Sequence, residues 1–370
     1  MIIYFFSIKH LPYIKITFMR IFYNVGTGLF SVEKIYDNFI VYDCGGQSMC
    51  KITKAIIRAF KKRDIIEAVF ISHYDKDHIN GLHFLLQYCQ VKRLILPMMS
   101  DSTKIYYLVS EEYDENEINF ILDPQEYIDK LDINTSIHYV DYPNNEIYHP
   151  NNIPEDFNDL ESKRLKFIPS GVQLKISKKY NWVYIPWNIK TLTQIEEDHF
   201  MKELKKLIFN DVNYKIDNIK TLWEEYQLCD KNNNIKKAIQ KLIGTASKTI
   251  NAMSQTLYSG PIIDYKNCIC KNGCLYLGDF DAKQNFAPLF NIYKEVWNEI
   301  KIIQIPHHGS PNNFNKNLIK RNIVAIISAS INPIYKVNPK EVVNLLEKHN
   351  ILPRITGTEG DIKIKGCPYI

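Results

Sequence analysis

Two histidines and two aspartates lie within six consecutive positions of this 370-residue chain, in an H-x-D-x-D-H run at 73–78. The run directly follows an apolar stretch at 68–71, which predicts a buried strand. Ligand-type side chains crowded into a loop at a strand end cannot all point away from one another. They are typical of a site for two divalent cations, or for one cation and a water-activating base. A solvated polar loop is the alternative, and it would suffice for a single histidine or aspartate. The candidate metal ligands in this loop are His73, Asp75, Asp77 and His78.

The composition is that of a globular protein, with 45% hydrophobic and 24% charged residues. The net charge of +5 is compatible with a polyanionic substrate but does not require one. No run of about 18 apolar residues is present, so we expect no membrane-spanning helix and no membrane partner. The eight cysteines form no disulfide framework, which fits a cytoplasmic, reducing location.

Strands and helices alternate from residue 19 to residue 97, and the same pattern returns after residue 251. This alternation predicts layered α/β packing. Residues 101–165 are more polar and less regular, and we expect surface excursions there. Residues 190–250 carry apolar residues at helical spacing with almost no glycine or proline, which predicts a helical insertion. These patterns divide the chain into one α/β domain over 19–189 and 251–370, the insertion at 190–250 and an N-terminal extension at 1–18.

Two later strands also end in ligand-type residues. Asp279 follows the apolar run at 274–277, and His307 and His308 follow the run at 302–305. Each of these residues alone is weak evidence for a metal ligand. An aspartate after a strand is usually a turn residue, and a histidine pair more often caps a helix or lies at the surface. A sheet gathers its strand ends into one crevice, so their recurrence predicts that they converge on the 73–78 loop.

Four segments resemble, in order along the chain, the motifs of metallo-β-lactamase-fold hydrolases: D-C-G-G at 43–46, S-H-x-D-x-D-H-x-x-G-L at 72–82, L-G-D at 277–279 and P-H-H-G-S at 306–310. Asp75 and the P-H-H-G-S ending resemble the branch that contains the hydrolase domain of the DNA-uptake protein ComEC. The resemblance extends from about residue 19 to the C-terminus, without 190–250 and most of 101–165. It implies an α/β fold, a metallo-β-lactamase-like four-layer α/β/β/α sandwich with a dinuclear site on the upper sheet edges.

The resemblance also implies roles for individual residues. The first metal would be bound by His73 and Asp75, and the second by Asp77, His78 and one of His307 and His308, with Asp279 bridging both. Asp43 would orient the motif loop from behind the ligands. Asp77 would also act in catalysis by accepting a proton from the attacking water. Three carboxylates favour harder cations than a histidine-rich site does, so manganese or iron competes with zinc for the two sites.

Two departures from the family pattern bear on the first metal. Many members supply a further histidine from the middle of the chain, where this sequence reads W-V-Y-I-P-W-N at 182–188. The ComEC branch tends to have histidine at the position of Asn338, which serves equally well as the N-cap of a helix that has Pro339 at its first position. A single-metal site is therefore the alternative to two ions.

The sequence is compatible with three functions. The first is a metal-dependent phosphodiesterase or nuclease acting on a phosphodiester or nucleic-acid substrate. The second uses the same ligands on a lactone, thioester or other ester, because both reactions involve attack by an activated water on a polarised centre. The third is a hydrolase subunit that docks a protein partner through the insertion at 190–250. A docking face there would consist of Leu204, Leu207, Trp223 and Tyr226, although such a stripe more often packs against its own domain.

Overall fold

The computed structural model describes residues 18–143, 155–176, 182–190, 193–211, 218–229, 237–238, 241–242, 254–261, 272–330 and 338–366. Of the N-terminal extension at 1–18, all but Phe18 lies outside these described residues. Within them, no helix is both long and apolar enough to cross a membrane.

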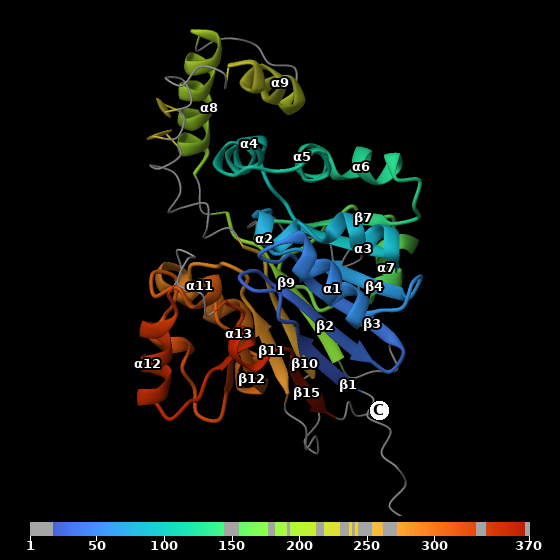
Figure 1. Ribbon diagram of the computed structural model, residues 1–370, viewed down its shortest axis with the longest axis vertical. Helices are drawn as coiled ribbons and strands as arrows, with labels where there is room; N and C mark the ends of the chain where they lie inside the picture. Colours follow the sequence, from blue (N-terminus) through green and yellow to red (C-terminus); the bar gives the residue numbers. More distant parts are fainter. Residues whose placement is uncertain are drawn as a thin grey trace, which may run out of the picture.

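Two sheets form the centre of the protein (Figure 1). The first has nine described strands, in the order β15 (Ile362–Gly366), β1 (Phe18–Phe22), β2 (Phe30–Ile35), β3 (Asn38–Cys44), β4 (Ile65–Phe70), β6 (Arg93–Pro97), β7 (Ser136–Val140) and β8 (Phe167–Ile168), with β5 (Gln90–Val91) also paired to β4. The second has six described strands, in the order β14 (Arg354–Ile355), β13 (Val324–Ile327), β12 (Ile300–Gln304), β11 (Gly273–Tyr276), β10 (Thr256–Pro261) and β9 (Trp182–Trp187).

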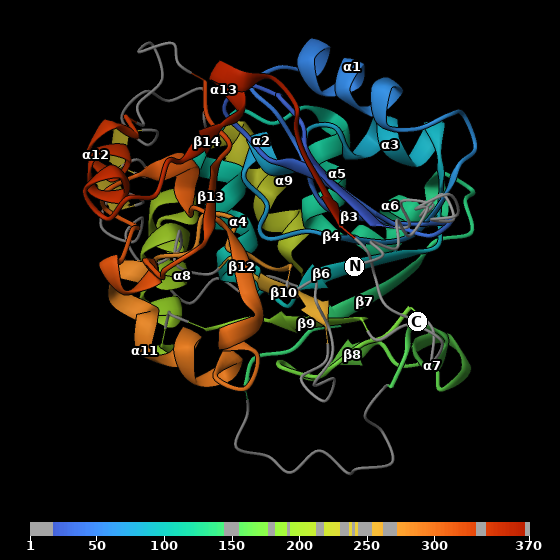
Figure 2. The same ribbon diagram turned by 90° about the horizontal axis from the view of Figure 1, so that it is seen from below.

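Helices cover the outer face of each sheet (Figure 2). Those on the side of the first sheet are α1 (Met49–Ala59), α2 (Lys76–Ile79), α3 (Leu82–Tyr88), α4 (Asp101–Ser110), α5 (Glu115–Leu122) and α6 (Pro124–Lys130), with α8 (Gln194–Phe209) and α9 (Ile219–Cys229) beyond α4. Those on the side of the second sheet are α11 (Ala282–Tyr293) and α12 (Lys340–Lys348). Two shorter helices are α7 (Phe157–Ser162) and α13 (Thr356–Glu359).

Alternate side chains of the central strands enter different apolar layers. On β3, Val41 packs toward the helices, whereas Ile40 and Tyr42 face the second sheet. On β11, Tyr276 faces the first sheet and Leu275 packs toward α11 and α12. Because both faces of each sheet are covered, the strands read as nearly continuous apolar runs. The layers are helix, sheet, sheet and helix, which confirms the predicted four-layer α/β/β/α sandwich.

The strands that precede the candidate ligands are parallel. β3, β4 and β6 pair in parallel in the first sheet, and β11, β12 and β13 do so in the second. The carboxyl ends of parallel neighbours lie on one edge of a sheet, so each sheet presents its loops on a single side.

The expectation of surface excursions over 101–165 is wrong. This segment forms α4, α5, α6 and α7, and it contributes β7 to the first sheet. Ile105, Tyr107 and Phe120 are among its buried residues. Acidic and amide residues interrupt the apolar residues of this segment, as at 111–119, so the apolar spacing that would indicate helices is weak in the sequence.

The residues proposed as a docking face lie on α8 and α9. Leu204, Trp223 and Tyr226 are buried, Leu207 is half-buried, and both helices contact α4. The apolar stripe therefore packs against the chain's own helical layer and lends no support to a partner site. The division of the chain into a domain and an insertion stays a prediction.

A buried ion pair of the first sheet accepts hydrogen bonds from the second sheet. On β1 and β2, the Arg20 Nε donates to Glu33 Oε1 over 2.6 Å, and both side chains are almost completely shielded from solvent. From the second sheet, the Tyr276 hydroxyl donates to the same oxygen at 2.8 Å. The hydroxyls of Tyr184 and Ser259 donate to Glu33 Oε2 at 2.9 and 2.6 Å. The four donors satisfy this carboxylate, which is the condition under which a buried charge is tolerated.

We predict that Glu33→Gln lowers the free energy of unfolding by about 3–5 kcal/mol, because Arg20 would keep a buried charge without its counter-ion. The double variant Arg20→Met, Glu33→Leu should recover only part of this loss, since it removes both charges but takes the acceptor from the hydroxyls of Tyr184, Ser259 and Tyr276. Urea unfolding followed by circular dichroism measures both. The exposed pair of Lys130 and Glu126 provides the control: Glu126→Gln should leave the midpoint unchanged. An unchanged midpoint for Glu33→Gln would contradict the prediction.

Candidate metal centre

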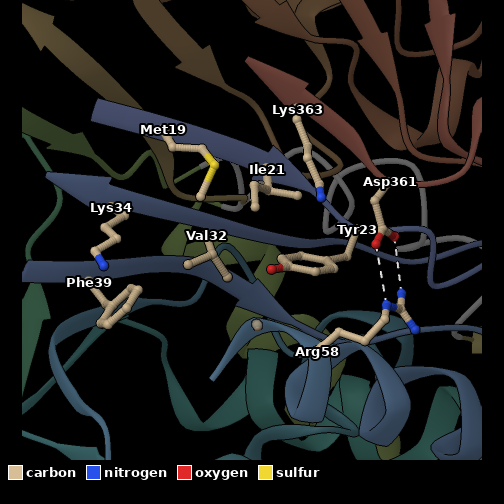
Figure 3. Close-up of a pocket in the computed structure, with 10 residues that line it drawn as sticks. Met19, Ile21, Tyr23, Val32, Lys34, Phe39, Arg58, Asp361 and Lys363 are labelled. Atoms are coloured by element: carbon tan, nitrogen blue, oxygen red, sulfur yellow. Dashed lines mark hydrogen bonds and ion pairs between the residues drawn. The ribbon is translucent and has the colours of Figure 1, made fainter. Parts of the chain in front are cut away.

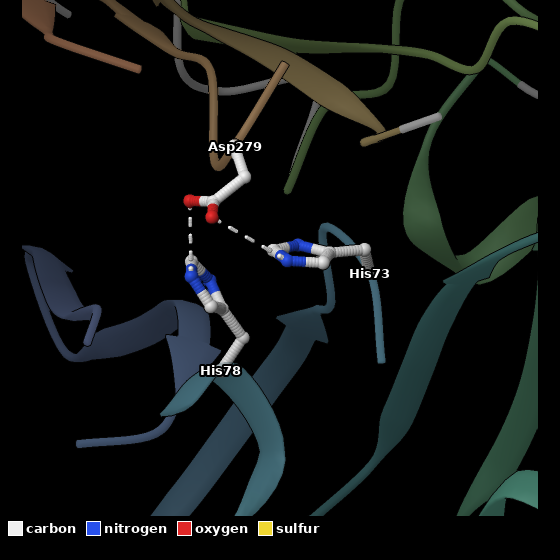
Figure 4. A group of neighbouring side chains, drawn as sticks. All are labelled: His73, His78 and Asp279. Atoms are coloured by element: carbon white, nitrogen blue, oxygen red, sulfur yellow. Dashed lines mark ion pairs between the residues drawn. The ribbon is translucent and has the colours of Figure 1, made fainter. Parts of the chain in front are cut away.

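Three separate segments meet at the carboxyl edge of the sandwich. The Nε2 atom of His78, after β4, lies 3.1 Å from Oδ1 of Asp279, after β11. The His73 Nε2 lies 3.9 Å from the other oxygen of Asp279, and these three side chains point toward one another (Figure 4). After β12, the Nε2 of His308 lies 3.1 Å from Oδ2 of Asp77. The convergence predicted for the three strand ends is present.

Two glycines allow this close approach. A Cβ at Gly45, just after β3, would lie 2.2 Å from the carbonyl carbon of Asp77, so only glycine lets α2 pack against the end of β3. Gly278 has φ +51°, and a Cβ there would lie 2.6 Å from the Cβ of Ser72. The glycine before Asp279 therefore brings the second sheet into contact with the loop that carries His73.

Asp43 fixes the orientation of the 72–78 loop. Its carboxylate is fully buried and accepts the Ser72 backbone N–H at 2.6 Å, the Ser72 hydroxyl at 2.7 Å and the His78 Nδ1–H at 2.8 Å. Because Ser72 donates its hydroxyl hydrogen to Asp43, its oxygen accepts the Nδ1–H of His73, 2.8 Å away. Both imidazoles thus carry a proton on Nδ1 and turn Nε2 toward Asp279, the arrangement that metal-ligating histidines need.

The third imidazole is oriented by a backbone carbonyl. His308 Nδ1 donates to the Ser328 carbonyl oxygen at 2.8 Å, which leaves its Nε2 facing Asp77 and, at 3.7 Å, Asp279 Oδ1. His307 and His308 both have positive φ values, 48° and 52°. This conformation costs on the order of 1 kcal/mol for each residue. Both rings face Asp279, with Nε2 3.6 Å from this carboxylate for His307 and 3.7 Å for His308.

Several buried polar atoms of this site have no hydrogen-bond partner among the described residues, which fits a cation-binding site. The buried polar atoms without a hydrogen-bond partner in the described part of the chain include Nε2 of His73, His78 and His308 and Oδ1 of Asp279. An unprotonated Nε2 and a carboxylate oxygen are both acceptors, so they repel at 3.1 Å unless positive charge lies between them. Two groups have ligand atoms close enough to share an ion: His73, His78 and Asp279, and Asp77, His78 and His308. These donors fit a divalent metal.

The pKa shifts of His78 and Asp279 also indicate that positive charge is stabilised at this site. Burial acts to lower the pKa of His78, but the carboxylates of Asp279 and Asp43 outweigh it and hold this pKa well above its usual value. Burial acts to raise the pKa of Asp279, yet the surrounding histidines, His307 first, hold it well below its usual value. A metal cation would satisfy both kinds of group at once.

The remaining candidate ligands lie on the rim of this cluster. The Asp75 Oδ2 lies 3.2 Å from His73 Nε2, and the Asp77 Oδ1 lies 3.8 Å from His78 Nε2. The His307 Nε2 lies 3.6 Å from Asp279 Oδ2. Of the two adjacent histidines, His308 is the one whose ligand atom falls within a metal-sized group. The assignment of individual ligands to a first and a second ion stays a prediction.

Asn338 lies outside this cluster of contacts. Its side chain is exposed, and its Oδ1 accepts the backbone N–H of Lys340 at 3.0 Å. α12 begins at Lys340, one residue later than a helix with Asn338 as its N-cap. The observed role of Asn338 is thus at the start of this helix.

Two residues just before β10 contact the site, although the sequence gives no sign of this role. The Ser254 hydroxyl accepts the backbone N–H of Asp279 at 3.1 Å, and the Gln255 N–H donates to the Ser72 carbonyl at 2.7 Å. The segment at 182–188, where many members of the resembled family have a histidine ligand, forms β9 and then places Asn188, whose side-chain amide donates to the carbonyls of Met98 and Val140. Serine and glutamine are too common in loops for either contact to be predicted.

We predict that Asp43→Asn weakens metal binding about 10- to 100-fold, because an amide nitrogen cannot accept the hydrogen bonds that orient His73 and His78. Isothermal titration of the metal-free protein with Mn²⁺ and Zn²⁺ measures the loss. Asp37→Asn, in the exposed turn between β2 and β3, removes the same charge away from the site and is the control. Equal affinities for the two variants would show that Asp43 does not position the ligands.

A second prediction concerns stability. Metal at about 100 times its dissociation constant should add about 2.7 kcal/mol to the free energy of unfolding, and EDTA should reverse this gain. Asp279→Asn should remove most of the gain, because Asp279 faces both His73 and His78. Thermal unfolding with and without Mn²⁺ or Zn²⁺ provides the measurement. A metal-induced shift that is the same in Asp279→Asn as in the unchanged protein would contradict a metal site here.

Comparisons with known proteins give distant likenesses. No family model matches the chain, and no curated protein matches it. Similar solved structures include the metallo-β-lactamase fold protein YhfI from Bacillus subtilis, with 9% identity, TM-score 0.40 and coverage of 94% of this chain and 100% of that one. Human tRNase Z, short form, has 10% identity, TM-score 0.39 and coverage of 95% and 100%. A diphosphatase from the PhnP family has 9% identity, TM-score 0.35 and coverage of 94% and 98%. At these TM-scores the likenesses carry no argument, and the fold and the site rest on the layers and contacts described above.

Proposed function

We propose that this protein is a metal-dependent hydrolase that cleaves phosphodiester bonds, as a phosphodiesterase or nuclease. The observation that carries the proposal is the set of buried Nε2 atoms of His73, His78 and His308, unpartnered in the described structure and facing carboxylates. Such acceptor pairs need positive charge between them, either a proton on Nε2 or a metal ion, and the convergence of three imidazoles on Asp77 and Asp279 fits a divalent cation. Divalent cations at this position would supply an activated water and polarise the oxygens of the substrate.

The exposure of the ligands indicates the side from which a substrate approaches. The side chains of Asp75, Asp77 and His307 are 21%, 30% and 22% exposed, whereas that of Asp279 is 4% exposed. Asp279 therefore forms the floor of the centre, and the other three line its open side. We assign Asp77 the role of proton acceptor for the attacking water, because its carboxylate lies on that open side and against His308.

The metals we propose are manganese or zinc, with iron as the further possibility, bound as two ions. Asp75, Asp77 and Asp279 would contribute three carboxylates, which suit hard cations, and such ions, once bound, would stabilise the negative charge that develops as a phosphodiester is cleaved. The net charge of +5 is compatible with an anionic substrate of this kind. Esters and lactones use the same ligands, so direct assays must separate the two substrate classes.

We predict that the protein hydrolyses bis-p-nitrophenyl phosphate in the presence of Mn²⁺ or Zn²⁺ and not in EDTA. Asp77→Asn and Asp279→Asn should each lower kcat/KM about 100-fold or more, since loss of a ligand removes several kcal/mol of transition-state stabilisation. Asp198→Asn, on the exposed face of α8, is the matched control and should retain full activity.

Parallel assays with single-stranded DNA, cyclic nucleotides, p-nitrophenyl acetate and a homoserine lactone test the substrate class. Metal-dependent turnover of the acyl substrates with every phosphodiester intact would replace our proposal with the ester-hydrolase alternative. Phosphodiester cleavage that is undiminished in both aspartate variants would reject this centre as the active site.

A further inference from the structure

A second concave site lies on the outer face of the first sheet, between α1 and β15. The cavity has a volume of about 410 Å³, within the range of small-molecule sites. Its lining residues come from β1, β2, the start of β3, the last turn of α1 and the region of β15: Met19, Ile21, Tyr23, Val32, Lys34, Phe39, Arg58, Ala59, Asp361 and Lys363. None of the candidate metal ligands is among them, so the cavity is a separate site.

Strand register explains why apolar and cationic side chains share this surface. Cross-strand partners point to the same face of a sheet. Met19 is paired with Lys34 on β2, and Ile21 is paired with Val32 on β2 and with Lys363 on β15. The apolar side chains of β1 thus form a floor, and the two lysines flank it on the neighbouring strands (Figure 3).

Most of the charged side chains that line the cavity are positive. The guanidinium of Arg58 is paired with Asp361, with Nη2 and Oδ1 3.0 Å apart. Neither Lys34 nor Lys363 has an ion-pair partner in the part of the chain that the structure describes. The Lys34 ammonium lies 5.2 Å from the centre of the Phe39 ring. Two unpaired positive charges therefore face an apolar hollow.

We propose that this cavity binds a small organic anion with an apolar body, such as an aromatic or short aliphatic acid. The half-buried side chains of Met19 and Phe39 would contact the apolar part, since Ile21 and Val32 beside them are buried. The ammonium group of Lys34 or of Lys363, which lie on opposite sides of the hollow (Figure 3), would meet the acidic group. A neutral ligand would leave both charges uncompensated. A cation would be repelled.

The test uses the full-length protein and 2-naphthalenesulfonate, an aromatic anion that a hydrolase of phosphodiesters does not consume. Isothermal titration is carried out in EDTA, so that binding to metal is excluded. We expect saturable binding at one site per chain, weakened at least tenfold by the double variant Lys34→Gln, Lys363→Gln. The neutral analogue 2-naphthamide should bind the unchanged protein at least tenfold more weakly than the sulfonate.

Two further variants make the test specific. Ala59→Trp fills the cavity from the α1 wall and keeps both lysines, so it should abolish binding while the protein stays folded by circular dichroism. Lys62→Gln, Lys283→Gln removes two exposed lysines elsewhere and should leave the affinity unchanged. Asp279→Asn should also bind the sulfonate normally, because the cavity and the metal centre share no residue.

Three outcomes would overturn the proposal. The first is no binding of the sulfonate to the unchanged protein. The second is equal affinity in the Lys34, Lys363 double variant and in the Lys62, Lys283 control. The third is equal affinity for the sulfonate and the neutral amide, which would make the hollow an apolar face that recognises no acid.

Discussion

The buried carboxylate of Asp43 is the constraint on which the metal centre depends. It lies at the end of β3 with a positive φ of 56°, and it receives hydrogen bonds from Ser72 and His78 in the loop after the next strand. Through the Ser72 hydroxyl it also sets the tautomer of His73. One carboxylate thereby aims two imidazoles at Asp279. A ligand set that is oriented before metal arrives binds more tightly, because little side-chain freedom remains to be lost.

Holding Asp279 and His308 against that loop requires the two sheets to keep a fixed position relative to each other. Apolar packing between the sheets does not specify such a position by itself, because it is non-directional. The Glu33 carboxylate adds directional contacts, with Arg20 from its own sheet and Tyr184, Ser259 and Tyr276 from the other. The polar cluster inside the sandwich and the metal centre at its edge are thus parts of one arrangement.

Much of the fold could be predicted from the sequence where apolar periodicity is strong. The strands around residues 40, 69, 275 and 303 were identifiable because their side chains are buried on both faces and read as apolar runs. The helices of 101–165 were not, since acidic and amide residues interrupt the apolar residues there, as in the run E-N-E-I-N-F at 115–120, and weaken the helical spacing. The hydrogen bonds that Ser254 and Gln255 make to the metal-centre loops could not be predicted either. They involve backbone groups, which every residue type has.

The sequence by itself determined which chemical groups this protein has for binding metal and that they follow the ends of buried strands. This follows from residue type and apolar pattern, which are local properties. Only the tertiary structure decided that His308 faces Asp77, that His73, His78 and His308 turn Nε2 toward the carboxylates, and that Lys34 and Lys363 flank one hollow. Those outcomes depend on hydrogen bonds and strand register between residues far apart in the chain, and no local pattern encodes them.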